Sequence, residues 1–290
     1  MNDYLLSFLL GVVEGLTEFL PVSSTAHLRV AEALLGVSLS DGYWKMYAIV
    51  IQLGAILSLP VYFRARIAEL AATFPRGRAG DRTWMTHPLS LTMLAFVCTA
   101  LPSLMLTKVI GKNLESLGVM AWALIVGGAV MWVVDVWYER KGGGIANMEE
   151  MGTGQAVWIG ACQTLAAVFP GVSRSMATIA AGQLGGMTRA TALEFSFFLS
   201  IPTMVAATGY NLVKALQPVA EGGPSPLGSA EMTAHGWVVL GIGFAISFFV
   251  AMGAVAWFLR WVRQHGFVPF AIYRIVAGAL LLAWAMRGGG

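Results

Sequence analysis

The sequence predicts an all-α integral membrane protein with six transmembrane helices and two re-entrant helical hairpins. The chain of 290 residues is 57% hydrophobic and only 11% charged, with a mean hydropathy of +0.72. A soluble domain carries about a quarter charged residues, so this composition excludes the soluble class. The apolar runs are too long for β-barrel strands and lack a period of two, so the spans are expected to be helices.

The first apolar stretch, 4–13, leads into two carboxylates. Glu14 and Glu18 are four residues apart, so on a helix they lie on one face. Each ionised acid at membrane depth costs about 2.5–3.5 kcal/mol on insertion scales, and like charges at this spacing repel. The pair therefore indicates a compensating metal ion, proton or cationic partner.

A helix break follows these acids. Pro21 stops the helix because it lacks an N–H and disfavours the helical conformation of the residue before it. Ser23, Ser24 and Thr25 are residue types that cap the start of a new helix. Such a break, with hydroxyls and free N–H groups, is suited to bind an anion. His27 adds an imidazole close to the turn.

The later apolar runs give six full spans and a second hairpin. The hairpin arms have about 10–14 residues, too few to cross a core of about 30 Å at 1.5 Å per residue. The full spans are expected at 46–63, 88–109, 117–138, 191–216, 237–259 and 267–286. The second hairpin is expected to have arms at 154–169 and 173–187, broken at Pro170.

The loops divide by charge. Loops 64–87, 139–151 and 260–266 are basic, whereas loop 217–235 has two glutamates and no Lys or Arg. Basic loops face the cytoplasm, which places both termini outside and makes the two hairpins enter from opposite sides. Phosphate or nucleic-acid binding by the arginines of loop 64–87 is the less favoured alternative, and we expect no nucleic-acid partner.

The second hairpin repeats the first at a fixed offset. We interpret the chain as a single membrane domain, 1–290, built from inverted repeats 1–138 and 152–290, as in secondary transporters. The aligned pairs are Gly11 with Gly160, Glu14 with Gln163, Leu16 with Leu165, Pro21 with Pro170, Ser24 with Ser173, Thr25 with Arg174, and Gly36 with Gly185.

Arg174, in the second break, is interpreted as the one arginine deep in an apolar setting. A guanidinium offers a rigid set of donors that can bind a phosphate through two parallel hydrogen bonds. If the two hairpin tips meet, Arg174 faces both acids, the imidazole and the hydroxyls of the two breaks. These hydroxyls belong to Ser23, Ser24, Thr25, Ser173 and Ser175. The alternative is that Arg174 is simply the counter-ion of Glu14 or Glu18, and Gln163 is expected to be a helix–helix hydrogen-bond partner.

Five motifs resemble those of the bacitracin-resistance type undecaprenyl-diphosphate phosphatase family, and the resemblance covers nearly the whole chain. They lie at 14–27, 51–54, 170–175, 194–197 and 269–274. The resemblance implies a bacterial inner-membrane enzyme that hydrolyses undecaprenyl diphosphate to undecaprenyl phosphate, the carrier of cell-wall glycans, and that confers bacitracin resistance. It implies a divalent metal, Mg²⁺ or Ca²⁺, and a site that opens to the periplasm.

The resemblance also implies that Glu14, Glu18, Ser24, His27 and Arg174 carry the chemistry, with both acids on the metal. Whether Ser24 or His27 is the nucleophile or the base stays open. The expected partners are a polyprenyl diphosphate and membrane lipid, and a homodimer is left open. The chain departs from the family pattern at Ala26, Met176 and Ala48, which puts activity and lipid preference in question.

Two other functions remain as alternatives. Inverted repeats and a phosphate site at mid-membrane also suit a polyprenyl-phosphate flippase or transporter. A structural membrane protein with a buried ion-pair network is the weakest alternative, because it leaves His27 and the serine clusters unexplained. Release of phosphate by the purified protein distinguishes the enzyme from a carrier.

Overall fold

A computed structural model describes residues 2–37, 42–113, 116–216 and 233–287 of the chain, and these residues are helical apart from turns, loops and one isolated β-bridge. The elements are α1 (Asp3–Thr17), α2 (Ser24–Leu35), α3 (Gly42–Tyr62), α4 (Arg64–Thr73), α5 (Pro88–Met105), α6 (Thr107–Asn113), α7 (Leu117–Lys141), the short 3₁₀ helix η1 (Met148–Glu150), α8 (Thr153–Val168), α9 (Arg174–Leu184), α10 (Arg189–Leu216), α11 (Ala234–His265) and α12 (Val268–Met286). The all-helical prediction is confirmed for this part of the chain. Most of the acidic loop 217–235 lies outside the described residues.

Several helices are long and apolar enough to cross a membrane. Within the described ranges these are α5, α7, α10, α11 and α12, and α3 joined to α4 makes a sixth if the bent pair counts as one span. The bend between α3 and α4 is 60°. The chain is therefore a multi-pass membrane protein, as the composition predicts.

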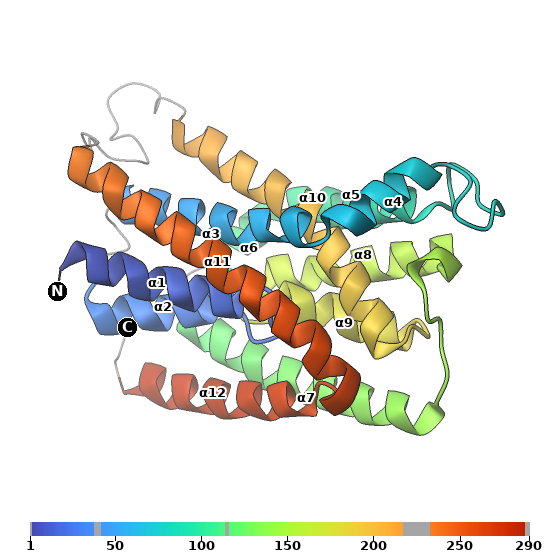
Figure 1. The fold of residues 1–290 in the computed structure, drawn as a ribbon. Coiled ribbons are helices and arrows are strands. Elements are labelled where there is room, and N and C mark those ends of the chain that lie inside the picture. Colours follow the sequence, from blue (N-terminus) through green and yellow to red (C-terminus); the bar gives the residue numbers. More distant parts are fainter. Residues whose placement is uncertain (1, 38–41, 114–115, 217–232, 288–290) are drawn as a thin grey trace.

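The helices run roughly side by side, and the two short hairpins lie at opposite ends of the bundle (Figure 1). The α1–α2 hairpin lies toward the end that carries both chain termini, and the α8–α9 hairpin lies toward the end that carries α4. α1 packs on α11, α8 packs on α5, and α12 packs along α7. The turns of the two hairpins therefore point toward each other in the interior of the bundle.

Several expected boundaries differ from the structure. The segment 260–266 was expected to be a loop, but α11 continues through it to His265, because no Pro or Gly lies in this segment before Gly266. The segment 64–87 was expected to be a loop, but its first ten residues form α4, because no residue before Phe74 and Pro75 breaks a helix and Leu70 is fully buried. The expected span 88–109 ends instead at Met105, where Leu106 leaves the helical conformation and the chain turns into α6.

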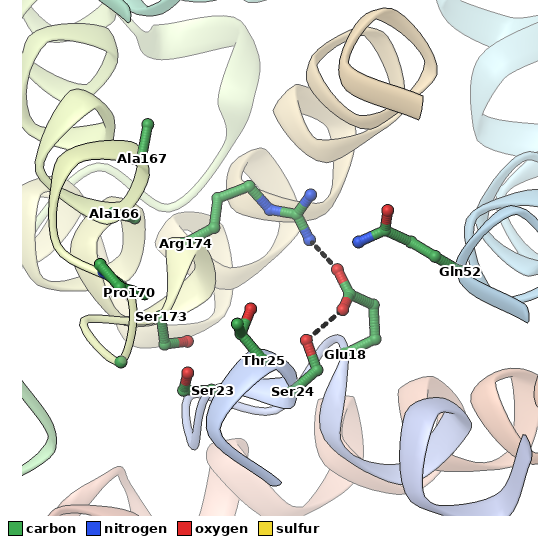
Figure 2. A pocket seen from close by; sticks show the side chains of 11 residues that line it. Glu18, Ser23, Ser24, Thr25, Gln52, Ala166, Ala167, Pro170, Ser173 and Arg174 are labelled. Carbon is green, nitrogen blue, oxygen red and sulfur yellow. Dashed lines mark hydrogen bonds and ion pairs between the residues drawn. The ribbon is translucent and has the colours of Figure 1, made fainter. Parts of the chain in front are cut away.

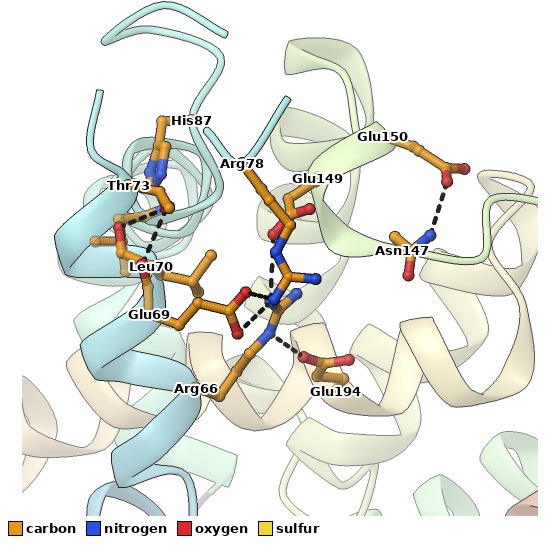
Figure 3. A network of polar contacts seen from close by, with 11 residues as sticks. Arg66, Glu69, Leu70, Thr73, Arg78, His87, Asn147, Glu149, Glu150 and Glu194 are labelled. Carbon is orange, nitrogen blue, oxygen red and sulfur yellow. Dashed lines mark hydrogen bonds and ion pairs between the residues drawn. The ribbon is translucent and has the colours of Figure 1, made fainter. Parts of the chain in front are cut away.

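Charged residues beside α4 form a network at the end of the bundle that carries this helix (Figure 3). The Arg66 Nη1 donates to Glu69 at 3.1 Å and to Glu149 at 3.2 Å, and its Nε donates to Glu194 at 3.1 Å. These contacts join α4 to η1 and α10. Arg66 is thus bound by three carboxylates, which favours a structural role for it over phosphate or nucleic-acid binding.

An aromatic core supports the turn of the first hairpin. Phe19, which follows α1, is fully buried and packs edge-on against Phe197 of α10, with ring centroids 5.8 Å apart. Phe197 belongs to the motif 194–197, which the structure thereby assigns to packing beneath the hairpin turn and, through Glu194, to the Arg66 network.

Candidate active site

The turn of the first hairpin has a tightly capped geometry. α1 ends at Thr17, and Pro21 follows in the turn, as the sequence predicts. Ser23 is the N-cap of α2 and has a φ of 72°, a conformation that is rare for a residue with a Cβ. Its hydroxyl accepts a hydrogen bond from the Ala26 N–H at 3.5 Å. The first N–H groups of α2 have no intrahelical partner and are available to an anion.

The turn of the second hairpin has the same local design. Ser173 is the N-cap of α9, has a φ of 69°, and accepts from the Met176 N–H at 3.4 Å. The structural counterparts are therefore Ser23 and Ser173, and the fixed-offset pairing of Ser24 with Ser173 is wrong by one residue. The second turn is one residue longer between its proline and its cap, and Gly171, with a φ of 100°, lies in this stretch.

A cavity of about 240 Å³ lies where the two turns meet (Figure 2). α1 and α2 contribute polar groups from one side, α9 contributes from the other, and α3 contributes an amide. The lining residues are Glu18, Ser23, Ser24, Thr25, Gln52, Ala166, Ala167, Pro170, Gly171, Ser173 and Arg174. Six of the nine predicted site residues thus line one cavity, although the two hairpins lie far apart in the sequence.

Glu18 is the centre of this cavity. One carboxylate oxygen accepts from the Arg174 Nη2 at 3.0 Å, and the other accepts a hydrogen bond from the Ser24 hydroxyl. The Glu18 side chain is only 5% exposed, so its charge is stabilised by the guanidinium rather than by water. The ion pair that the sequence left as an alternative is present, and it connects the two hairpins directly.

Glu14 lies one helical turn before Glu18 and does not line the cavity. It is 1% exposed, and neither of its carboxylate oxygens has a hydrogen-bond partner among the residues that the structure describes. A buried carboxylate without partners is costly, so it requires a proton or a cation. In the described ranges no group of three or more His, Cys, Asp or Glu side chains could hold a metal.

These two carboxylates nevertheless fit a hard divalent cation. Mg²⁺ is commonly bound through one or two carboxylates together with substrate phosphates. The unpartnered oxygens of Glu14 and the second lone pairs of the Glu18 oxygens are donors of the right kind.

His27 lies on the other face of α2. Its Nδ1 is 2.7 Å from the Ser23 carbonyl oxygen, and its Nε2 is 2.6 Å from the Tyr273 hydroxyl. The carbonyl requires the proton on Nδ1, so Nε2 accepts from Tyr273. The ring stacks on Tyr273 beside an apolar cavity of about 460 Å³ and does not reach the cavity around Glu18. Ser175, another predicted residue, is buried and also does not line that cavity.

Sequence reasoning missed two residues near the site. Gln52 of α3 lines the cavity, and its Oε1 accepts from the Thr208 hydroxyl at 3.4 Å. Arg274 of α12 is fully buried, so the interpretation of Arg174 as the one arginine deep in an apolar setting is wrong. Both residues lie inside motifs that the sequence comparison had already singled out, 51–54 and 269–274, and the unused signal was a lone polar residue within an apolar span.

Gln163 has the role that the sequence predicts. Its Nε2 donates to the Thr99 hydroxyl of α5 and to the Thr203 hydroxyl of α10, both at 3.0 Å. It therefore connects α8 with two neighbouring helices at the position where the first hairpin carries Glu14.

Comparisons with known proteins agree along nearly the whole chain. The family model described as bacitracin resistance protein BacA matches residues 7–280. An undecaprenyl-diphosphatase of Koribacter versatilis (strain Ellin345) is 64% identical over 99% of this chain and 100% of its own length. One of Novosphingobium aromaticivorans is 42% identical over 99% of this chain and 100% of its own length, and one of Caldanaerobacter subterraneus subsp. tengcongensis is 38% identical over 95% and 94%. With matches of this extent, the chain belongs to the bacitracin resistance protein BacA family.

Proposed function

We propose that this protein hydrolyses undecaprenyl diphosphate to undecaprenyl phosphate and inorganic phosphate. The observation that carries the proposal is the cavity in which Ser24, Glu18 and Arg174 meet, in a chain 64% identical to a relative named undecaprenyl-diphosphatase. The substrate is a lipid, in agreement with a site placed among apolar helices. Family membership also supports a contribution to bacitracin resistance.

Ser24 is favoured as the nucleophile. Its hydroxyl donates to a Glu18 oxygen, which is the arrangement of a nucleophile beside its general base. In the proposed step the Ser24 oxygen attacks the terminal phosphorus, its proton passes to Glu18, and the bond to the bridging oxygen breaks. Undecaprenyl phosphate leaves, and water then hydrolyses the phosphoserine to free phosphate. His27 is disfavoured as the attacking group because both of its nitrogens are engaged on the other face of α2.

The phosphoryl oxygens would be bound by Arg174 and by hydroxyl and N–H groups at the starts of α2 and α9. Ser23, Thr25 and Ser173 line the cavity and supply these groups, whereas Ser175 would act through its backbone N–H. Such donors stabilise charge that develops in the transition state. Glu14 and Glu18 would hold Mg²⁺ or Ca²⁺, which would draw charge from the diphosphate.

The decisive experiment measures phosphate release from undecaprenyl diphosphate by the detergent-purified protein. We expect release in the presence of Mg²⁺ or Ca²⁺ and its loss in excess chelator. A wild-type protein that binds the lipid but releases no phosphate would favour the alternative, a polyprenyl-phosphate flippase or transporter. The hairpins at opposite ends of the bundle keep this alternative in consideration.

We also propose a membrane orientation. The chain would have six spans and two re-entrant hairpins, arranged as inverted repeats 1–138 and 152–290, in the bacterial inner membrane. Both termini and the opening of the site would face the periplasm, in agreement with the basic residues around α4 at the opposite end.

Cysteine labelling tests this orientation. In a background with Cys98 and Cys162 replaced by serine, Asn2→Cys should react with an impermeant thiol reagent on intact spheroplasts, and Gly77→Cys should not. Labelling of Gly77→Cys from outside would reverse the orientation. Positions 229 and 290, which the charge pattern also places outside, lie beyond the described residues. A homodimer stays a prediction, to be checked by the mass of the protein in lipid nanodiscs.

A further inference from the structure

Arg274 is a buried cation that the proposed chemistry does not use. It lies within α12, an apolar helix long enough to span a membrane, and it is fully buried. Ionised groups at such depth are costly and persist where the protein supplies partners. Among the described residues, no carboxylate forms an ion pair with Arg274. Its partners are backbone carbonyls instead.

These carbonyls come from both hairpin turns. The Nη1 of Arg274 donates to the Pro21 carbonyl of the first turn at 2.8 Å. The Nη2 donates to the carbonyls of the second turn, Gly171 at 3.0 Å and Val172 at 2.9 Å, and to Ala123 of α7 at 3.1 Å. A single guanidinium therefore holds together the two turns that form the cavity.

The contact to Val172 also orients the peptide that precedes the second cap. A trans peptide is planar, and its N–H points opposite to its C=O. Because the Val172 carbonyl points at Arg274, the N–H of Ser173 points away from Arg274. Ser173 itself lines the cavity and has the unfavourable φ of 69°. A conformation of this kind persists only where surrounding contacts hold it.

We propose that Arg274 is a positioning residue for the phosphate site. It holds the turn before Ser24 and the turn before Arg174 against each other, so that both residues face one cavity, and it aims the Ser173 N–H at a bound phosphoryl group. The inference rests on the proposed function for the identity of the substrate. The claim that Arg274 positions groups that bind an anion does not depend on that function.

Arginine suits this task better than lysine. The four carbonyls are distributed over two nitrogens of one planar group, whereas a lysine ammonium is a single point with three donors. Arg274→Lys would keep the charge but lose the hydrogen bonds to the carbonyls of at least one of the two turns. The variant therefore separates the geometric role from simple charge compensation.

Two glycines of the α7–α12 interface allow a test that leaves Arg274 in place. A Cβ on Gly127 would lie 2.4 Å from the Arg274 Nη2 and 2.7 Å from the Met176 Cε, which is the far end of a flexible side chain, so Gly127→Ala pushes the guanidinium off its carbonyls. A Cβ on Gly278 would meet Ile125, Ala121 and Leu124 at 2.7–3.0 Å, and its three nearest atoms do not include Arg274. Gly278→Ala disturbs the same interface and is the matched control.

The experiment measures two properties of the purified full chain in detergent, after size exclusion has shown that each variant is folded. One is kcat and KM for undecaprenyl diphosphate, and the other is the affinity for inorganic pyrophosphate, from its stabilisation against heat. We expect Arg274→Lys to lower kcat about 100-fold, by analogy with the loss of an oxyanion donor, and to weaken pyrophosphate binding at least tenfold. Gly127→Ala should shift both in the same direction, and Gly278→Ala should lower the Tm while keeping both within twofold.

The proposal is overturned if Gly127→Ala keeps normal kcat and pyrophosphate affinity, or if Gly278→Ala impairs both as strongly. If Arg274→Lys does not fold, the glycine pair decides. A wild type that binds pyrophosphate without hydrolysing the lipid, with binding weakened only by Gly127→Ala, refutes the proposed function but supports the positioning role. A wild type that neither hydrolyses the lipid nor binds pyrophosphate would contradict both the proposed function and the positioning role of Arg274.

Discussion

The two hairpin turns have the same backbone conformation but carry side chains of opposite charge. Each has a proline, then a serine cap with a φ near 70°, then a helix whose first residues line the same cavity. The first turn adds carboxylates, Glu14 and Glu18, whereas the second adds a guanidinium, Arg174, and carries the neutral Gln163 where the first has an acid. The two turns therefore have one capped backbone conformation in common, and side-chain differences make the first turn acidic and the second cationic.

This division explains why the proposed site needs both hairpins. The acids of the first hairpin would repel a diphosphate without a cation, and Arg174 without Glu18 would be an unpaired buried charge. The ion pair between Arg174 and Glu18, at 3.0 Å, reduces the negative charge of the first hairpin and gives Arg174 a partner before substrate binds. The pair is therefore compatible with catalysis, because a bound phosphoryl group can compete with Glu18 for the same guanidinium.

The largest effect is expected for Glu18→Gln. The amide cannot accept the Ser24 proton or carry the charge that pairs with Arg174, so turnover should fall by about 10²–10³. The variant should still fold, which size exclusion checks, and its turnover is measured as phosphate release per folded molecule. Full activity in this variant would remove Glu18 from the chemistry and make its ion pair structural.

Glu14→Gln makes the first hairpin resemble the second, which has Gln163 at this position. We expect turnover to fall about 100-fold, because one of two proposed cation ligands is lost. The metal-free variant should also have a higher Tm than the metal-free wild type, since a buried carboxylate without partners is removed. Thermal unfolding in chelator measures this, and an unchanged or lower Tm would contradict the cost assigned to burying this acid.

Arg174→Lys tests the cationic half of the comparison. An ammonium can pair with Glu18 but cannot make two parallel bonds to a phosphoryl group, so hydrolysis should slow at least tenfold in a folded protein. Near-normal turnover would show that Arg174 has a structural role and does not bind the phosphoryl group. Arg189→Lys is a control at an ion pair with Asp135, and neither of these residues lines the cavity, so the variant should keep normal turnover.

The two caps should be equivalent in stability. Ser23→Ala and Ser173→Ala each remove one hydroxyl that caps a helix, at a cost of about 1 kcal/mol of unfolding free energy. Denaturant or thermal unfolding in the same detergent compares them. A difference of more than about twofold in this cost would show that the turns are alike in backbone only.

The smallest effect is expected for Tyr273→Phe. Removing this hydroxyl frees the His27 Nε2 without touching the Ser23 contact, so kcat should stay within about threefold if His27 acts only by holding the turn. The pH–rate profile should keep its shape as well. A loss comparable to that of Glu18→Gln would make the His27–Tyr273 pair part of the reaction.

Much of this protein could be predicted from the sequence because the determining physics is local. Apolar runs of sufficient length become membrane helices, and Pro21 and Pro170 break helices wherever they occur. The serines after these prolines cap new helices for the same reason. Most helix ranges, both breaks and the grouping of Glu18, Ser24 and Arg174 were therefore predicted.

Only the tertiary structure decided which way single side chains face. His27 and Thr25 are two residues apart on α2, yet rotation about the helix axis turns one toward Tyr273 and the other into the cavity. Arg274 binds carbonyls that are 102 to 253 residues away in the chain. Every residue has a backbone carbonyl, so such partners cannot be recognised from the residue types in a sequence. The sequence by itself determined which helices and breaks exist; their mutual rotation and close packing decided which polar groups share the cavity.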